Sequence, residues 1–126
     1  MANTGPSHEK RQAEALAVLA EKEANIQDFL VNGALTKTSG IKKLTKASAG
    51  AYTLAAPTAA EEGAEITIVA NTAFAHVITA TGLINDGVTG GSKNTITMGA
   101  FVGASITLIA MDLKWTVKAK TVATVV

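Results

Sequence analysis

The sequence predicts a mainly β protein: an N-terminal α-helix followed by an antiparallel β-sandwich, jelly-roll-like domain or small barrel of about eight strands. Two observations lead to this prediction. Helix-forming Ala, Leu, Glu, Lys and Gln dominate residues 1–35, whereas 16 of the 17 threonines follow residue 35. The spacing of apolar residues also changes there, from helical to alternating. We therefore expect a flexible arm at 1–6, a helix at 7–33 and a β domain at 36–126.

Composition excludes several classes of function. The 126 residues include no cysteine, so disulfides, thiolate metal sites and cysteine nucleophiles are ruled out. The net charge of +1 gives no reason to expect nucleic-acid binding. No apolar run is long enough to span a bilayer, and the polar N-terminus does not resemble a signal peptide. We expect a chain made in the cytosol, with no cofactor, whose five aromatics and 24 alanines make only a thin core.

The expected helix has clear boundary signals. Ser7 is a good N-cap and Glu9 follows in the first turn, while Asn32 and Gly33 supply a stop. Its apolar stripe can pack against the chain's own β domain or against other copies or another protein. We favour the second interpretation because the stripe is narrow and an alanine face lies beside it. The stripe residues Leu16, Leu19, Ile26 and Leu30 are candidate interface residues.

The β domain is predicted from alternation of apolar and polar residues. Ile66 and Ile68 alternate with Thr67, for example, and threonines and lysines occupy the outer positions elsewhere. The expected strands are 41–46, 51–55, 64–70, 74–80, 94–98, 104–110, 113–118 and 120–126. We expect hairpin turns at 71–73 and 111–112. Residues 63–70 and 103–110 also resemble each other, which suggests two related three-strand units, each with a hairpin.

One cluster of charge stands out in the β domain. Lys37, Lys42, Lys43 and Lys46 lie close together in sequence, with no aromatic residue between them that could stack on a nucleic-acid base. Lysines of this kind usually protect an exposed strand edge. The alternative is a charged docking surface, for which Lys42 and Lys43 are the candidates.

The remaining candidates for chemistry have simpler structural interpretations. His76 lies in a strand without triad partners at an evident spacing, and we expect it to be structural. Trp115 is a core anchor by its alternation, with a carbohydrate platform as the alternative. The glycine-rich segment 81–94 lacks the order of a phosphate loop and is expected to be a surface loop. Glu61 and Glu62 adjoin a turn, where solvated carboxylates are common.

The β region resembles small structural proteins of tailed-bacteriophage virions, above all capsid decoration (cement) and head-fibre proteins. The resemblance is carried by residues 52–60, 63–69, 75–80 and 103–110, followed by Trp115. It covers roughly residues 50–118 and its motifs are structural repeats. The N-terminal helix departs from compact all-β decoration proteins.

The resemblance implies a non-enzymatic protein on the outer surface of a virion. Its partner would be the major capsid protein, at gaps between hexamers and pentamers. It implies a homo-oligomer, with a trimer favoured over a dimer, and no role for nucleic acid or membrane. The alternative is a receptor- or glycan-binding module of a fibre or baseplate, with Trp115 and segment 81–94 as the contact surface. An enzyme that uses His76 ranks third.

Overall fold

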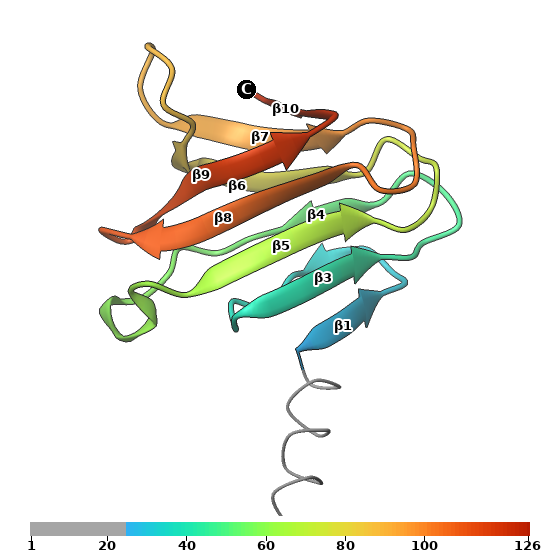
Figure 1. Cartoon of the computed structure of the whole chain (residues 1–126), viewed down its shortest axis with the longest axis horizontal. Coiled ribbons are helices and arrows are strands. Elements are labelled where there is room, and N and C mark those ends of the chain that lie inside the picture. Colours follow the sequence, from blue (N-terminus) through green and yellow to red (C-terminus); the bar gives the residue numbers. More distant parts are fainter. Residues whose placement is uncertain (1–24) are drawn as a thin grey trace, which may run out of the picture.

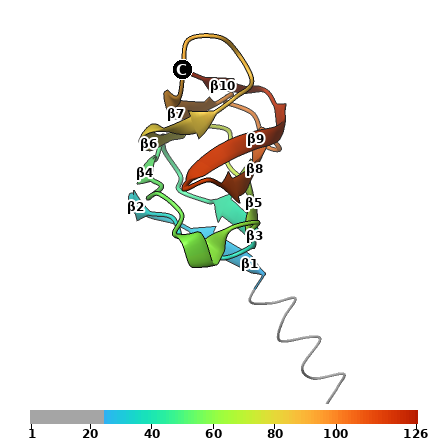
Figure 2. The same ribbon diagram turned by 90° about the vertical axis from the view of Figure 1, so that its left-hand side faces the viewer.

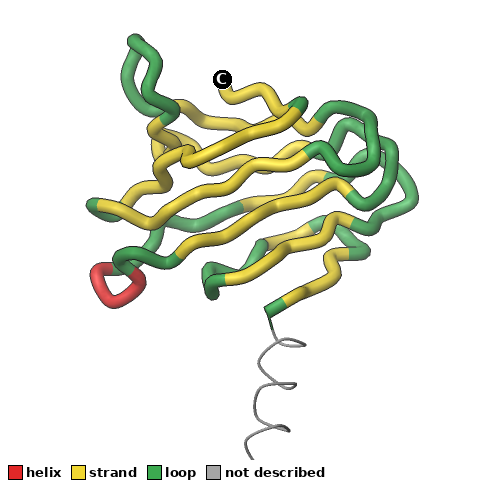
Figure 3. Tube along the Cα trace, in the orientation of Figure 1, coloured by secondary structure: helices red, strands yellow, loops and turns green. Residues whose placement is uncertain are grey.

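The computed structural model describes residues 25–126, which form ten β-strands (Figure 1). The expected arm at 1–6 and most of the expected helix at 7–33 lie outside this range. The strands are β1 (Ile26–Phe29), β2 (Gly33–Ala34), β3 (Gly40–Leu44), β4 (Ala51–Thr53), β5 (Glu65–Ala70), β6 (Val77–Asn85), β7 (Lys93–Met98), β8 (Ser105–Met111), β9 (Lys114–Thr121) and β10 (Ala123–Val125). Within the described residues the only helical element is the short 3-10 turn η1 (Ala59–Glu61), red in Figure 3.

All strands belong to one curled sheet that forms a half-barrel. Eight of them follow the order β1-β3-β5-β8-β9-β6-β4-β2, and β7 and β10 extend the sheet from β6. Figure 2 shows the sheet end-on as two facing walls. The first wall contains β1, β3, β5, β8 and β9, and the second contains β2, β4, β6, β7 and β10. The path starts at β1 and ends at β2, so the half-barrel is open there, and we call this the open end.

The first six strands alternate between the two walls. β1, β3 and β5 stack in parallel in the first wall, and β2, β4 and β6 stack in parallel in the second. The chain thus winds from wall to wall, as in a two-sided β-solenoid. The expectation of a purely antiparallel domain is therefore wrong, because alternation shows which side of a strand is buried and does not show its partner.

The last four strands close the half-barrel opposite the open end. β8 runs antiparallel to β5, and β9 runs antiparallel to β8. β9 also meets β6 in parallel, at Ile84↔Trp115, which joins the two walls. β6 can reach both β7 and β9 because its register shifts between Thr79 and Ile84, where Gly82 has a positive φ of 68°. We call the part of the structure around β8 and β9 the closed end.

The core fills the space between the walls. Inward residues alternate with outward ones along the strands, as in β5 and β8. The largest apolar side chains with no exposed surface are Trp115, Leu44, Ile66, Ile68, Ile78, Ile84, Ile96, Met98, Ile106 and Leu108. Burial of aliphatic side chains thus stabilises a domain with few aromatic residues.

The predicted strands of the β domain are all present, but the C-terminal part of the predicted helix is wrong. Residues 26–29 and 33–34 form β1 and β2. Ile26 and Phe29 are residues that strands favour, and β1 pairs with β3 along its whole length. Pairing with β3 and β4 satisfies these backbone groups where the composition alone favoured a helix.

Only one of the two predicted hairpins forms. β8 and β9 are joined by a tight turn at Asp112 and Leu113, both with positive φ, as a type I′ turn requires. Residues 71–73 instead carry the chain from the first wall to the second, so only one of the repeated segments leads into a hairpin. The repeated segments are nevertheless neighbours. Thr67 and Thr107 lie opposite each other in β5 and β8, with their hydroxyls 3.1 Å apart.

Candidate functional site

The open end gathers exposed apolar side chains on an unpaired sheet edge. Among the described strands, β1 pairs only with β3 and β2 only with β4. Ile26 in β1 is 48 % exposed, and Leu30 and Val31 in the turn that follows are 63 % and 72 % exposed. An apolar strand edge of this kind readily receives another chain. The open end is therefore the candidate interaction site.

The turn between β1 and β2 is held by the second wall. Tyr52 is buried in β4, and its hydroxyl donates to the Phe29 carbonyl at 3.1 Å. Burial raises the pKa of Tyr52, so the hydroxyl keeps its proton at neutral pH. The Asn32 side-chain oxygen accepts the Ala51 backbone N–H at 2.9 Å. These contacts fix the backbone that presents Leu30 and Val31.

A buried lysine lies just inside the open end. Lys42 in β3 is 1 % exposed and points into the core, where its ammonium donates to Gln27 Oε1 at 2.7 Å and Thr38 Oγ1 at 3.1 Å. Thr36 also donates its hydroxyl to Gln27 Oε1. No carboxylate in residues 25–126 forms an ion pair with Lys42. Burial therefore lowers the pKa of Lys42.

The structure separates the residues that the sequence suggested as an interface. Leu16 and Leu19 lie outside the described residues. Ile26 and Leu30 are exposed at the open end, as an interface requires, but on β1 and its turn instead of a helix. Lys42 is buried, so its side chain is not available to an outer docking surface. Lys43 points outward and pairs with Asp28 at 3.4 Å.

The four clustered lysines do not form one charged surface. Lys37 pairs with Glu61 at 3.0 Å, and the Lys46 ammonium donates to Ser48 Oγ at 2.6 Å. Edge protection by Lys42 and Lys43 is also wrong, because β3 lies between β1 and β5. The sequence could not show this, since β1 was expected to be helical.

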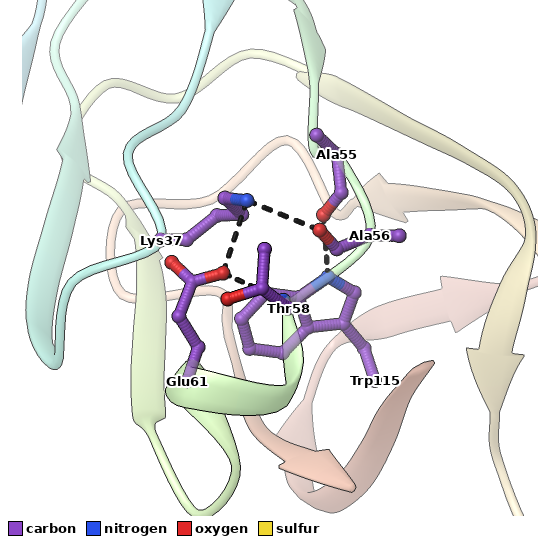
Figure 4. A network of polar contacts seen from close by, with 6 residues as sticks. All are labelled: Lys37, Ala55, Ala56, Thr58, Glu61 and Trp115. Atoms are coloured by element: carbon purple, nitrogen blue, oxygen red, sulfur yellow. Dashed lines mark hydrogen bonds and ion pairs between the residues drawn. The ribbon is translucent and has the colours of Figure 1, made fainter. Parts of the chain in front are cut away.

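Trp115 is a core anchor, as predicted. Its ring is fully buried, and the indole N–H donates to the Ala55 carbonyl at 2.9 Å (Figure 4). Residues 54–62, which we call the strap, pass over this ring. The Lys37 ammonium ties the strap down by donating to the Ala56 carbonyl at 3.1 Å and pairing with Glu61. A buried ring cannot be the platform of a glycan site.

Glu61 and Glu62 have separate structural roles. Glu61 accepts the Thr58 N–H at 2.7 Å, and this bond and Lys37 lower the pKa of its carboxyl. Glu62 accepts the Asp112 N–H at the β8–β9 turn, at 3.1 and 3.2 Å. Glu61 thus joins the strap to Lys37 in the β2–β3 connection, and Glu62 joins it to the closed end. Segment 81–94 is only partly a loop, because β6 continues to Asn85 and β7 begins at Lys93.

His76 is buried and both its ring nitrogens are hydrogen-bonded. Nδ1 accepts the Gly50 N–H at 2.9 Å, so the proton of the neutral ring is on Nε2, 2.8 Å from the Thr72 hydroxyl. That hydroxyl donates to the Lys46 carbonyl at 2.7 Å. Burial lowers the pKa of His76. The ring therefore joins two crossovers between the walls, which is a structural role.

No three His, Asp or Glu side chains within residues 25–126 come together in a way that would hold a metal ion. No helix there has the length and apolar character needed to cross a membrane.

Comparison with known proteins adds no relative. Neither the models of protein families nor the curated protein sequences give a match to this chain.

Proposed function

We propose that this chain is a structural protein of a tailed-bacteriophage virion, a decoration protein that binds the outside of the capsid and stabilises it. The observation that carries the proposal is the open end, where Ile26, Leu30 and Val31 are exposed beside two strand edges that pair with no other strand of residues 25–126. The resemblance to decoration proteins names the partner. Its segments 52–60, 63–69, 75–80 and 103–110 include most of β4, β5 and β8 and the first four residues of β6.

The physical reason is that the free protein leaves apolar surface and main-chain groups of the open end in water, which is unfavourable and which a partner would remedy. Apolar side chains on a sheet edge remain hydrated in the free protein, and β1 and β2 have no strand partner on one side among the strands that the structure describes. A neighbouring protein that covers this edge buries the side chains and pairs the backbone. The major capsid protein would be that neighbour, and the chain would act at the outer surface of the virion as a homo-oligomer.

The capsid would be stabilised if the chain binds the assembled shell and does not bind the unassembled subunits. A ligand that binds one state and not another shifts the equilibrium toward the bound state by mass action. Each decoration protein would add a small free energy, and a capsid has many equivalent sites. This role needs no catalytic step and no cofactor.

Substitution of Val31 tests the open end as the capsid contact. We expect Val31→Asp to weaken co-sedimentation with undecorated heads of the phage that encodes the chain by more than about tenfold, because it places a charge in an apolar contact. Val88→Asp is the matched control, since Val88 is 63 % exposed in the distant 86–92 loop. It should bind as the unsubstituted chain does.

Two outcomes would contradict the proposal. The unsubstituted chain could fail to sediment with the heads, or Val31→Asp could bind as well as the control. Circular dichroism of both variants verifies that the sheet is intact.

A further inference from the structure

The two walls of the half-barrel differ sharply in charge. The five strands of the second wall contain a single charged residue, Lys93, at the start of β7. Its ammonium donates to the Thr89 carbonyl in the adjacent loop at 3.3 Å. The strands of the first wall contain seven charged residues: Asp28, Lys42, Lys43, Glu65, Lys114, Lys118 and Lys120. The outer surface of the second wall is therefore nearly free of charge.

The outward residues of the second wall form two aligned rows. One row is Thr53, Thr79 and Thr95, and the other is Ala51, Val77, Thr97 and Thr124. We call these seven residues the threonine face. Neighbouring strands lie about 4.8 Å apart, so the rows form a regular lattice of hydroxyl and methyl groups. β2 borders the face on one side, and β10, which contributes Thr124, is its other margin.

Several polar groups on the first wall pair with one another. Asp28 pairs with Lys43 at 3.4 Å, and Glu65 pairs with Lys118 at 3.0 Å. Thr67 and Thr107 are within hydrogen-bond distance, as described above. The first wall therefore differs from the second mainly in its charges, which are suited to water; the side chains of Ser105, Thr116, Lys120 and Thr121 there also form no hydrogen bond within residues 25–126.

The threonine face has kept its hydrogen-bonding capacity. Only one of its five hydroxyls, that of Thr95, donates to another group in the described chain, the Val126 carbonyl at 3.4 Å. The hydroxyls of Thr53, Thr79, Thr97 and Thr124 form no hydrogen bond within residues 25–126. Four hydroxyls on a regular, uncharged surface are thus free to bond to another molecule.

We propose that the threonine face packs against the same face of a second copy of this chain. A threonine hydroxyl is both donor and acceptor, so a threonine surface is complementary to itself. A neutral surface also avoids the repulsion that a charged patch meets on its own copy across a two-fold axis. A charged partner such as nucleic acid would leave its charges unpaired here. Each copy has one such face in its described part, which makes the assembly a pair.

The size of the face sets the strength of this contact. Four strands and two rows give an area of about 250 Å² per copy, from strand spacings of about 4.8 Å and residue spacings of about 3.4 Å. This is well below the roughly 800 Å² per partner of a stable complex. Free chains should therefore associate weakly, and copies held together on one particle should associate much more strongly.

Lysine substitutions provide the first arm of the test. In sedimentation velocity up to millimolar concentration, the unsubstituted chain should show reversible dimers. Thr79→Lys, at the centre of the face, should weaken dimerisation by at least about tenfold because it puts like charges opposite each other. Thr121→Lys is the matched control: it is an exposed strand threonine on the first wall and should leave dimerisation unchanged.

Distance measurement provides the second arm and does not depend on how Thr79→Lys folds. The chain has no cysteine, so Thr79→Cys or Thr121→Cys carries one nitroxide label. Facing sheets pack about 10 Å apart, so labels at 79 should lie within about 20 Å of each other, and labels at 121 beyond about 30 Å. A monomer at every concentration would overturn the proposal, and so would the shorter distance at 121. The capsid contact at the open end is tested separately and survives either result.

Discussion

The closed end and the open end of the half-barrel bury very different side chains. At the closed end, Trp115 is fully buried, and its one polar atom is satisfied by the Ala55 carbonyl at 2.9 Å. At the open end, the buried side chains include Lys42, whose ammonium is held by two neutral oxygens. Burying an apolar ring is favourable, whereas burying a charge without a carboxylate is costly.

This difference indicates where the stability of the fold resides. The ring, the strap and the β8–β9 hairpin connect both walls at the closed end. The open end ends in short strands, with β2 only two residues long. Regions with fewer buried apolar contacts open at lower free energy, and binding sites are often found among them. The closed end thus stabilises the fold, and the open end is free to serve a partner.

Trp115→Ala should give the largest effect on stability. Removing a fully buried aromatic side chain should lower the free energy of unfolding by about 3–5 kcal/mol, as measured by urea denaturation. Trp115→Phe keeps most of the apolar volume and loses the hydrogen bond to Ala55, so it should cost less. A loss under about 1 kcal/mol for Trp115→Ala would place the main stabilising contacts elsewhere.

Protonation of His76 should have the next largest effect on the free energy of unfolding. The neutral ring accepts the Gly50 N–H, and protonation would remove that acceptor. Because the folded pKa lies below the ordinary value of about 6.5, the folded chain binds fewer protons than the unfolded chain in this window. Stability should therefore fall as pH drops below about 6.5 and level off below the folded pKa.

His76→Gln separates this effect from other titrations. It should lower the free energy of unfolding by about 1–3 kcal/mol at pH 7.5, because buried partners lose their hydrogen bonds. Its loss of stability between pH 7.5 and 5 should be smaller than that of the unsubstituted chain. The free energy of unfolding of both proteins is measured by urea denaturation at each pH. An equal loss between pH 7.5 and 5 would show that His76 does not cause the acid sensitivity.

The sequence predicted more of the closed end than of the open end. Alternation located β5, β8 and β9 to within a few residues, and it placed Trp115 in the core. At the open end, helix-forming residues run directly into Ile26–Phe29, so composition favoured a helix where pairing with β3 makes a strand. The burial of Lys42 had no signal either, because an inward lysine looks like any other lysine in a strand.

The sequence also could not predict which wall each strand belongs to or which strands pair with each other. A connection such as 71–73 is short enough for a hairpin, yet it crosses between walls because β5 already has β3 and β8 as neighbours. The threonine face depends on that topology. Thr53, Thr79 and Thr95 come from three strands, and only the parallel pairing of β4 with β6 and the antiparallel pairing of β6 with β7 align them.

Lys42→Met should have the smallest effect and tests the open end directly. Methionine fills a similar volume without a charge, so the penalty for burying the ammonium disappears while Gln27 Oε1 and Thr38 Oγ1 lose a donor. The free energy of unfolding at pH 7 should stay equal or rise by up to about 1 kcal/mol. Lys43→Met is the control at the adjacent, outward position.

The dependence of the free energy of unfolding on alkaline pH shows whether the buried charge of Lys42 causes this effect. Burial lowers the pKa of Lys42, so the unsubstituted chain should gain stability as pH rises through the folded pKa toward the unfolded value of about 10.4. Lys42→Met should lack that gain, and Lys43→Met should retain it. If Lys42→Met instead lost more than about 2 kcal/mol at pH 7, the ammonium would stabilise the open end. The two ends would then differ in the chemistry of their buried groups, and both would contribute to the stability of the fold.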